Sequence, residues 1–427
     1  MRLLSTATLI VLAMGIMAVY LPMLYGKIFF DQVGKTHLFY SPVTERFIYT
    51  EKIVGTIPPE AFATAEDHHA ELAYRDQDGR WYSRVDFEKR LPFIYYKNME
   101  LWGLLPLKIG GETFDKKTIK TNRQVLELKK QDIAGYRPRV SFWPLLESNP
   151  GQARLLFPDD RFRMTDQRME FVNADTNRID KTLTTRFTKA LKAEGFTFPC
   201  RSVNGKFTIL KPFDEGVFLV DATYSVFHLK REQGKPVVVR TPIDPRLKTR
   251  HIKVSESKRR EYYGMLLSKT GSLHLITYDN YALIDLPLKG YDPDTMDIKL
   301  ILNPLYCTAV YSNEETIHAV VMDRNYYTVA TYQHRMSRAN KTTSESVYKA
   351  LFPFRIDPDN LDGKGYLGMS ITTGGSLAFI GIAGSLLFSI LWSYGKHRRF
   401  PDKLKLAIIA LTGVYGVITL MFVRLRD

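Results

Sequence analysis

The densest group of side chains that could hold a metal ion lies in the segment AEDHHAEL. There Glu66, Asp67, His68, His69 and Glu71 bring imidazoles and carboxylates close together in the sequence. Adjacent histidines point to opposite faces of a strand and diverge on a helix, so they seldom bind one ion together. We therefore predict a solvated loop or a helix start at this segment, and no metal site.

Two further histidines, His228 and His274, occupy matching places in a weak internal repeat described below. Side chains at equivalent repeat positions could ligate something in a central channel. Core histidines whose ring nitrogens are hydrogen-bonded within the protein are far commoner, and we favour that interpretation for both.

The sequence contains no motif typical of covalent catalysis or of nucleotide binding. The chain lacks G-x-x-x-x-G-K-[ST], G-x-S-x-G, H-E-x-x-H and C-x-x-C, so it is not the ATPase of a transporter and offers no catalytic residue or cofactor site. Cys200 and Cys307 could form a disulfide in an exported domain, but we expect two buried free thiols.

Three long apolar stretches dominate the hydropathy of the chain. A bilayer core of about 30 Å needs around 20 apolar residues in a helix. We predict membrane helices over residues 3–26, 369–394 and 406–423, since globular helices rarely stay uncharged over such lengths. A cleaved signal peptide is the alternative for the first stretch, although MAVYLPMLYG lacks an A-x-A-like cleavage site.

The loop between the last two stretches, residues 395–405, is strongly basic. Short loops rich in lysine and arginine stay in the cytoplasm. This predicts a bacterial inner-membrane protein with a cytoplasmic N-terminus and a large periplasmic domain, although the two arginines of the RLRD tail would then lie outside. The topology-determining residues are Lys396, Arg398, Arg399, Lys403 and Lys405.

Small residues form a stripe along the second predicted membrane helix. Gly374, Ala378, Gly381 and Ser385 recur at helical spacing, which lets two helix backbones approach closely in lipid. The stripe predicts either packing between the last two helices or contact with a membrane partner.

The intervening residues, 27–340, are expected to be mainly β structure, followed by a juxtamembrane linker over 341–366. Hairpin turns are predicted at Asp78-Gly79, Asn204-Gly205 and Gly271. One amphipathic helix is expected in DKTLTTRFTKALKAEGF, ending at Gly195.

The internal repeat suggests a propeller. FLVDATYSVFHL, MLLSKTGSLHLITY and AVVMDRNYYTVATY each resemble an apolar strand, a polar turn and a second apolar strand. Four-stranded blades recur at about 40 to 50 residues, so an irregular propeller of six or seven blades would fit. A β-sandwich or two smaller β domains remain the alternatives.

The aromatic-rich run YSRVDFEKRLPFIYYKNMELWGLLPLKIGG, together with GYDPDTMDIKLILNPLY and IHAVVMDRNYY, resembles a known family. Its members are large uncharacterised membrane proteins of Gram-negative anaerobes, classed under a domain of unknown function. The resemblance covers nearly the whole chain and implies an association with ABC-transporter components. It implies no catalytic or binding residues.

These patterns leave two main functional hypotheses. The net charge of +15 fits contact with anionic lipid, and no nucleic-acid-binding motif is present. The favoured hypothesis is a non-catalytic accessory or scaffold subunit beside the permease and ATPase of an ABC transporter. The alternative is a cell-envelope enzyme, such as a hydrolase, lyase or quinoprotein, that uses a propeller channel. A sensor is disfavoured because so little of the chain would be cytoplasmic.

Overall fold

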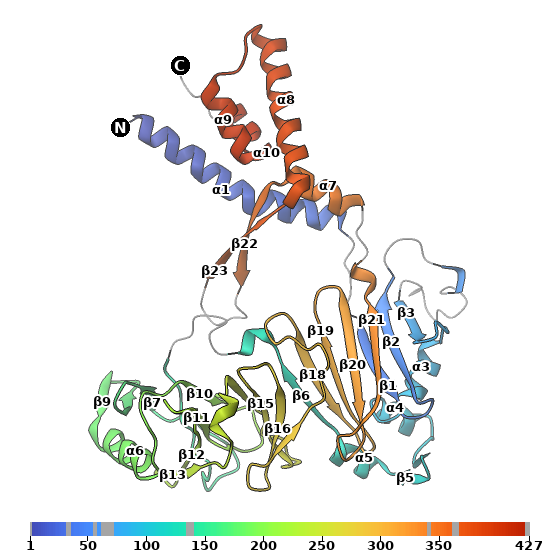
Figure 1. Cartoon of the computed structure of the whole chain (residues 1–427), viewed down its shortest axis with the longest axis vertical. Helices are drawn as coiled ribbons and strands as arrows, with labels where there is room; N and C mark the ends of the chain where they lie inside the picture. Colours follow the sequence, from blue (N-terminus) through green and yellow to red (C-terminus); the bar gives the residue numbers. More distant parts are fainter. Residues whose placement is uncertain are drawn as a thin grey trace. The chain divides into compact units, whose positions relative to one another are not determined.

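The computed structural model describes residues 2–30, 36–53, 58–60, 72–133, 141–339, 343–360 and 367–422 (Figure 1). The chain divides into two compact units. The β unit is Gly34–Ala339, and the helical unit combines Met1–Val33 with Asn340–Asp427. Each is described by itself.

The β unit consists mainly of antiparallel sheets. Three of them follow one another along the chain, and each is a meander of sequential neighbours. The strands of these sheets are β7 (Asp160–Met164), β8 (Met169–Asn173) and β9 (Arg178–Asp180); β10 (Ser202–Gly205), β11 (Val217–Val220), β12 (Val226–Glu232) and β13 (Lys235–Arg240); and β14 (His251–Val254), β15 (Tyr262–Leu267), β16 (Leu273–Thr277) and β17 (Leu283–Asp285).

A fourth, five-stranded sheet takes its strands from both sides of these meanders. Its order is β21-β20-β19-β18-β6, so β6 precedes the meanders in sequence and the other four strands follow them. The segment between β6 and β18 is therefore held at both ends by one sheet. The strands are β6 (Gln124–Leu128), β18 (Asp297–Leu302), β19 (Cys307–Ser312), β20 (Thr316–Met322) and β21 (Thr328–Arg335).

Successive sheets pack on one another. Phe162 and Phe171 of the first meander share a core with Phe227 of the second. Phe218 of the second packs with Ile276 of the third. The third meander and the five-stranded sheet share a further core that includes the fully buried Leu275 and Leu300. Apolar side chains that point inward thus form a core between each pair of neighbouring sheets.

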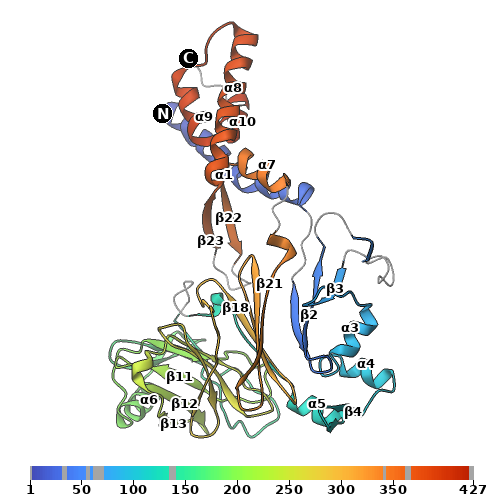
Figure 2. The ribbon, with the colours of Figure 1, turned by 45° about the vertical axis from the view of Figure 1, so that its right-hand side comes forward.

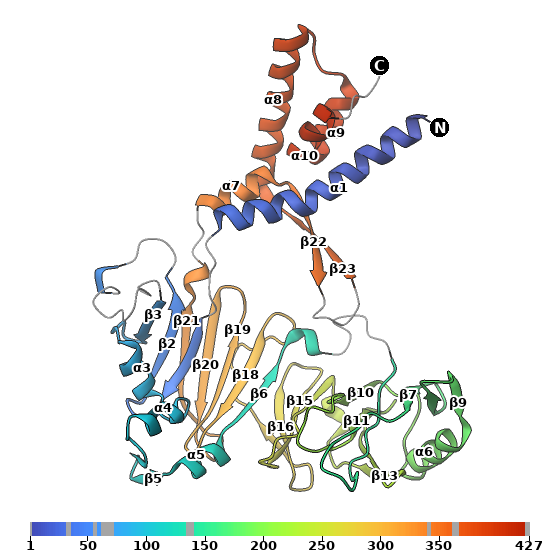
Figure 3. The same ribbon diagram turned by 180° about the vertical axis from the view of Figure 1, so that it is seen from behind.

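The first part of the β unit covers the other face of the five-stranded sheet. The strands β1 (His37–Ser41), β2 (Arg46–Lys52) and β3 (Leu72–Asp76) form a sheet whose Tyr40 and Phe47 pack against Ala319 and Val321. Smaller elements flank it, as Figure 3 shows from behind. They are α3 (Arg84–Arg90), α4 (Tyr96–Leu101), β4 (Leu107–Ile109), β5 (Glu112–Phe114) and α5 (Lys116–Asn122).

Two of the predicted turns and the predicted helix are confirmed. Gly79 and Gly271 adopt positive φ angles of 86° and 90° in tight turns, and α6 (Lys181–Ala193) ends just before Gly195. The turn predicted at Asn204-Gly205 is wrong. Both residues lie within β10, where the Asn204 side-chain oxygen accepts a hydrogen bond from the Ile252 amide at 3.0 Å and so ties β10 to β14.

The internal repeat corresponds to real hairpins, but these hairpins do not build a closed propeller of six or seven blades. The three repeat segments form the antiparallel pairs β11–β12, β15–β16 and β20–β21. In the described residues only two sheets have four strands, and the sheets close no barrel. The β unit is therefore a succession of unequal sheets, because the first half of the chain supplies short strands and helices where further blades were expected.

The helical unit contains two long apolar helices and a set of shorter elements (Figure 2). The helices α1 and α8 are long and apolar enough to cross a membrane, over Ala7–Phe29 and Gly375–Lys396. The segment predicted as a linker contains α7 and β22 instead. The elements are α1 (Arg2–Phe29), α7 (Thr343–Leu351), β22 (Phe354–Asn360), β23 (Leu367–Thr373), α8 (Ala378–His397), α9 (Lys403–Thr412) and α10 (Val414–Phe422).

The prediction of three membrane helices needs correction, because the third apolar stretch is not one helix. It breaks at Gly413, whose φ of 57° and ψ of −129° are incompatible with a helix and favour glycine. The second predicted helix also starts later than expected. Residues 367–373 form β23, in which Ile371, Thr372 and Thr373 are β-branched, and Gly374 and Gly375 follow before α8.

Candidate functional site

The outer surfaces of α1 and α8 are apolar along their length. Only 17% of the spanning window of α1 and 6% of that of α8 is buried inside the chain. Side chains such as Val11, Ile16, Phe379 and Leu391 are each at least half exposed. A continuous apolar surface of this kind is typical of contact with lipid or with another membrane helix.

The five basic residues predicted to set the topology gather at one end of this surface. Lys396 lies in the last turn of α8, Arg398 caps that helix in a left-handed conformation, and Lys403 begins α9. The Lys396 ammonium lies 5.8 Å from the ring centre of Trp392, which is itself half exposed. Aromatic rings beside basic residues at the end of an apolar helix are typical of a membrane–water interface.

The predicted small-residue stripe packs within the chain over most of its length. A side chain on Gly374 would overlap the Lys349 carbonyl oxygen, and one on Gly381 would overlap that of Ala350. Ala378 is 7% exposed between them, whereas Ser385 is partly exposed. The start of α8 therefore lies directly against the end of α7, and contact of this stripe with a membrane partner stays a prediction.

Two glycines of α8 lie on open surface instead. A side chain added at Gly384 or Gly395 would meet no atom within 4 Å. Gly384 leaves a gap between the exposed side chains of Ile380 and Phe388, one turn away on either side, and the described residues of the chain leave this gap uncovered.

The β unit holds a closed ionic cluster that the sequence did not indicate. The Lys211 ammonium donates to Asp214 Oδ1 at 2.5 Å and to Glu256 Oε1 at 2.6 Å, and all three side chains are at most 3% exposed. The amide of Glu215 also donates to Glu256 Oε1, at 2.8 Å. A charge buried at this depth requires compensation, which the lysine supplies.

Glu256 is the unusual member of this cluster. Its φ of 49° lies in the left-handed region, and its second carboxylate oxygen, Oε2, has no partner among the described residues. Burial raises the pKa of Glu256 to about 7, partly offset by the nearby Lys211. Such a carboxyl could exchange a proton near neutral pH, but the cluster is closed to solvent and no substrate reaches it in this conformation.

His228 lies next to this cluster. Both of its ring nitrogens are hydrogen-bonded within the protein, which confirms the prediction of a core histidine. Its Nε2 contacts the Glu215 carbonyl oxygen and therefore carries the proton, so Nδ1 accepts from the Tyr281 hydroxyl at 2.9 Å. Burial lowers the pKa of His228 to about 4, which keeps the ring neutral. Lys230 and Tyr278 bind the Glu215 carboxylate beside it.

The other predicted chemical groups are dispersed. His274 Nδ1 lies 2.6 Å from Asp285 Oδ1 on the neighbouring strand β17, but its Nε2 is buried without a partner among the described residues, so the predicted bonding holds for only one of its nitrogens. Cys200 and Cys307 are both free thiols, the first partly buried and the second buried. The segment Glu66–Glu71 lies outside the described residues. Among the residues that are described, no group of histidine, cysteine and acidic side chains could hold a metal ion.

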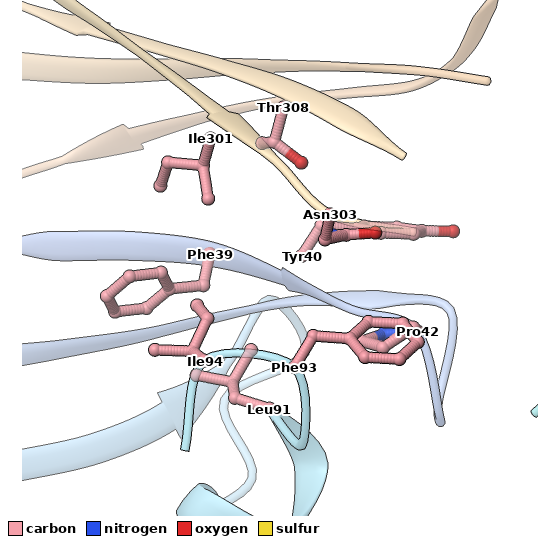
Figure 4. A pocket seen from close by; sticks show the side chains of 9 residues that line it. All are labelled: Phe39, Tyr40, Pro42, Leu91, Phe93, Ile94, Ile301, Asn303 and Thr308. Carbon is pink, nitrogen blue, oxygen red and sulfur yellow. The ribbon is translucent and has the colours of Figure 1, made fainter. Parts of the chain in front are cut away.

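Of two hollows in the described part of the β unit, one is very small and the other is open to solvent. Figure 4 shows one lined by Phe39, Phe93, Ile301 and other residues; its volume of about 10 Å³ suits one water molecule. A larger hollow of about 460 Å³ is open to solvent and is bordered by Asp244 and the Asp279–Leu283 turn.

Comparison with known proteins identifies the β unit. A family model described as "Domain of unknown function (DUF4857)" matches residues 37–322, which run from the start of β1 to the end of β20. The chain belongs to this family. The DUF4857 match lies entirely within the β unit, so the helical unit is outside it. No curated protein matches the chain.

Among solved structures, two overlap with parts of this DUF4857 protein. The β-propeller domain of Cps50 (Swd1) from Myceliophteria thermophila is 9% identical, covering 47% of this chain and 57% of its own, with a TM-score of 0.25. Dihydro-heme d1 dehydrogenase NirN is 11% identical, covering 54% and 56%, with a TM-score of 0.20. The chain thus spans little more than half the length of each, and superpositions this loose assign no fold.

Proposed function

We propose that this protein is a non-catalytic accessory or scaffold subunit in the bacterial cytoplasmic membrane, associated with the permease and ATPase of an ABC-type transporter. In this proposal α1 and α8 cross the bilayer, the N-terminus and the loop 395–405 are cytoplasmic, and the β unit is periplasmic. The observation that carries the proposal is the exposed apolar surface of α1 and α8, which the chain itself leaves almost uncovered.

Three further features support a binding role over catalysis. The polar cluster around Lys211 and Glu256 is closed to solvent. Its charged groups therefore contact one another inside the fold and not a ligand. The basic end of α8 suits the inner leaflet, where anionic lipid attracts lysine and arginine. The gap at Gly384 suits a side chain from a helix of another protein.

The proposal is tested by isolating the protein from its native membrane in mild detergent, through a tag on the β unit, and identifying what copurifies. Recovery of an ATPase and a permease in fixed ratio is the expected result. Recovery of the chain alone would contradict the transporter association.

Two matched variants make this test specific. Gly384→Leu adds bulk where the chain has open space, and we expect it to release the partners because a helix can no longer approach closely. Gly395→Leu adds the same bulk near the basic end of α8, also in open space, and should retain them. Equal recovery from both variants would exclude the gap at Gly384 as the contact.

A further inference from the structure

We infer that the last apolar stretch does not cross the membrane but forms a re-entrant hairpin, so that the C-terminus lies on the same side as the loop 395–405. This inference rests on the membrane placement proposed above. It concerns residues 403–422, where α9 and α10 meet at Gly413.

The chain reverses direction at Gly413. In a continuous helix, residues seven apart are separated by about 10 Å along the axis. A side chain added at Gly416 would instead lie 3.1 Å from the Cα atom of Ile409. Only a fold-back of α10 onto α9 brings these positions together, and the absence of a side chain at Gly416 permits the close approach.

The corner of the hairpin lies at the end of α8 that is remote from the basic loop. A side chain on Gly413 would lie 3.0 Å from Pro353 Cγ and 3.6 Å from Ile382 Cγ1, near the beginning of α8. The Tyr415 hydroxyl donates to the Phe354 carbonyl oxygen at 2.7 Å and fixes the corner there. Since α9 begins within the basic loop, at Lys403, it must run back along α8 to reach this point.

From the corner, α10 returns along α1. Tyr415 is fully buried and shares an apolar cluster with Ala18 and Met14 of α1. The helices α9 and α10 have 10 and 9 residues, so each is about 15 Å long and neither spans a hydrocarbon core of about 30 Å alone.

Three hydrogen bonds satisfy part of the corner internally, as polar groups in lipid require. The Gly413 amide donates to the Ile409 carbonyl oxygen at 2.7 Å, and the Val417 amide donates to that of Gly413 at 3.3 Å. The Thr412 hydroxyl donates to the Ile408 carbonyl oxygen at 2.6 Å.

The re-entrant path also removes a conflict in the charge distribution. Arg424 and Arg426 lie two and four residues after the end of α10, and four residues extend at most about 14 Å, too short to cross the hydrocarbon core. Arg424 and Arg426 are then on the side of the basic loop, as the distribution of positive charge in membrane proteins favours. A third crossing would have put both arginines on the opposite side.

The test uses reporter fusions to the full-length protein. Alkaline phosphatase is active only outside the cytoplasm and green fluorescent protein fluoresces only inside, so each is joined to the C-terminus and, in separate fusions, inserted at Gly234 in the β unit and at Arg399 in the basic loop. We expect fluorescence and no phosphatase activity at Arg399 and at the C-terminus, and the reverse at Gly234.

The three positions separate the possible failures. A C-terminus that reports outside, with Arg399 inside and Gly234 outside, would overturn the hairpin while leaving the proposed function intact. Arg399 and Gly234 reporting the same side would overturn the membrane placement itself, and the hairpin with it.

Discussion

At the scale of single residues, Glu256 and His228 are buried groups whose pKa values move in opposite directions. Burial raises the pKa of Glu256 to about 7 and lowers that of His228 to about 4, because it disfavours the charged form of each. The folded protein therefore retains a proton on one group and rejects it on the other. Their contributions to the pH dependence of stability oppose each other between about pH 4.5 and 6.5.

The variant Glu256→Gln separates these two contributions. The raised pKa of Glu256 means that its contribution to stability is complete below about pH 4.5 and is lost as the pH rises through about 7. We compare the change in the free energy of unfolding between pH 4.5 and pH 8 in the two proteins. In Glu256→Gln this change should be more favourable than in the unaltered protein by roughly 3 kcal/mol, because the loss due to Glu256 is absent. Chemical denaturation across this pH range measures the difference.

The control for this prediction is Glu194→Gln, at an exposed position at the end of α6. Its profile should run parallel to that of the unaltered protein. If Glu256→Gln also ran parallel, the pKa of Glu256 would not be raised and the cluster would not be closed to water.

At Gly216 the neighbouring backbone leaves no room for a side chain, so only glycine fits. It adopts a φ of 71°, and a side chain there would overlap the Leu229 carbonyl oxygen and lie 3.0 Å from Lys230 Cα. We expect Gly216→Ala to lower the free energy of unfolding by roughly 3 kcal/mol or more, because the backbone of β12 must move. Thermal or chemical denaturation provides the measurement.

Gly234 is a matched control for that substitution. Its φ of 72° is nearly the same, but a side chain there would meet no atom within 4 Å. Gly234→Ala should cost only about 1 kcal/mol, the conformational penalty alone. Equal losses from the two variants would mean that β11 and β12 do not approach as closely as the structure has them.

At the scale of elements, local patterns predicted those features that local chemistry decides. The turns at Gly79 and Gly271 and the helix ending at Gly195 follow from conformations that glycine adopts easily. Asn204-Gly205 carries the same signal but lies within a strand, because the Asn204 amide bonds across to β14. The ionic cluster was missed because Lys211 and Glu256 are far apart in sequence and only tertiary packing joins them.

The third apolar stretch shows the same limit. Its composition is that of a spanning helix, and only the backbone conformation at Gly413 reveals the corner. The variant Gly413→Ala tests what holds the corner. Alanine disfavours positive φ and favours a continuous helix by about 1 kcal/mol. We therefore expect a measurable fraction of C-terminal phosphatase fusions to become active, because residues 403–422 can then span the membrane.

The comparison for that variant is Gly384→Ala, which makes the same exchange in the continuous helix α8 with open space around it. It should leave the C-terminal reporter unchanged. An unchanged reporter in both variants would show that the contacts of Tyr415, rather than the conformation of Gly413, hold the corner.

At the scale of the whole molecule, the family match falls within one of the two units, and β21 of that unit follows the end of the match. The DUF4857 match starts at the first residue of β1 and ends at the last residue of β20, within the β unit. The strand β6 pairs with β18, so the meanders between them are tied at both ends to the sheet that also carries β20. The helical unit combines residues from both ends of the chain. None of its described strands pairs with a strand of the β unit, so the sheets of the β unit form without it.

The orientation of the whole protein should therefore depend on the charges next to the apolar helices and not on those of the β unit. Replacing the five lysines and arginines of the loop 395–405 with glutamine removes the bias that retains this loop in the cytoplasm. We expect a reporter at Gly234 to lose a large part of its phosphatase activity, but not all of it, since Arg2 and the terminal arginines remain as weaker determinants.

The control replaces the same number of exposed basic residues in the β unit. Their charges lie in a long translocated domain and should not affect the orientation. These are Arg178, Lys189, Lys192, Lys235 and Lys269. Equal phosphatase activity in both sets would mean that the basic loop does not decide the orientation, and that the folding of the β unit or a partner protein does.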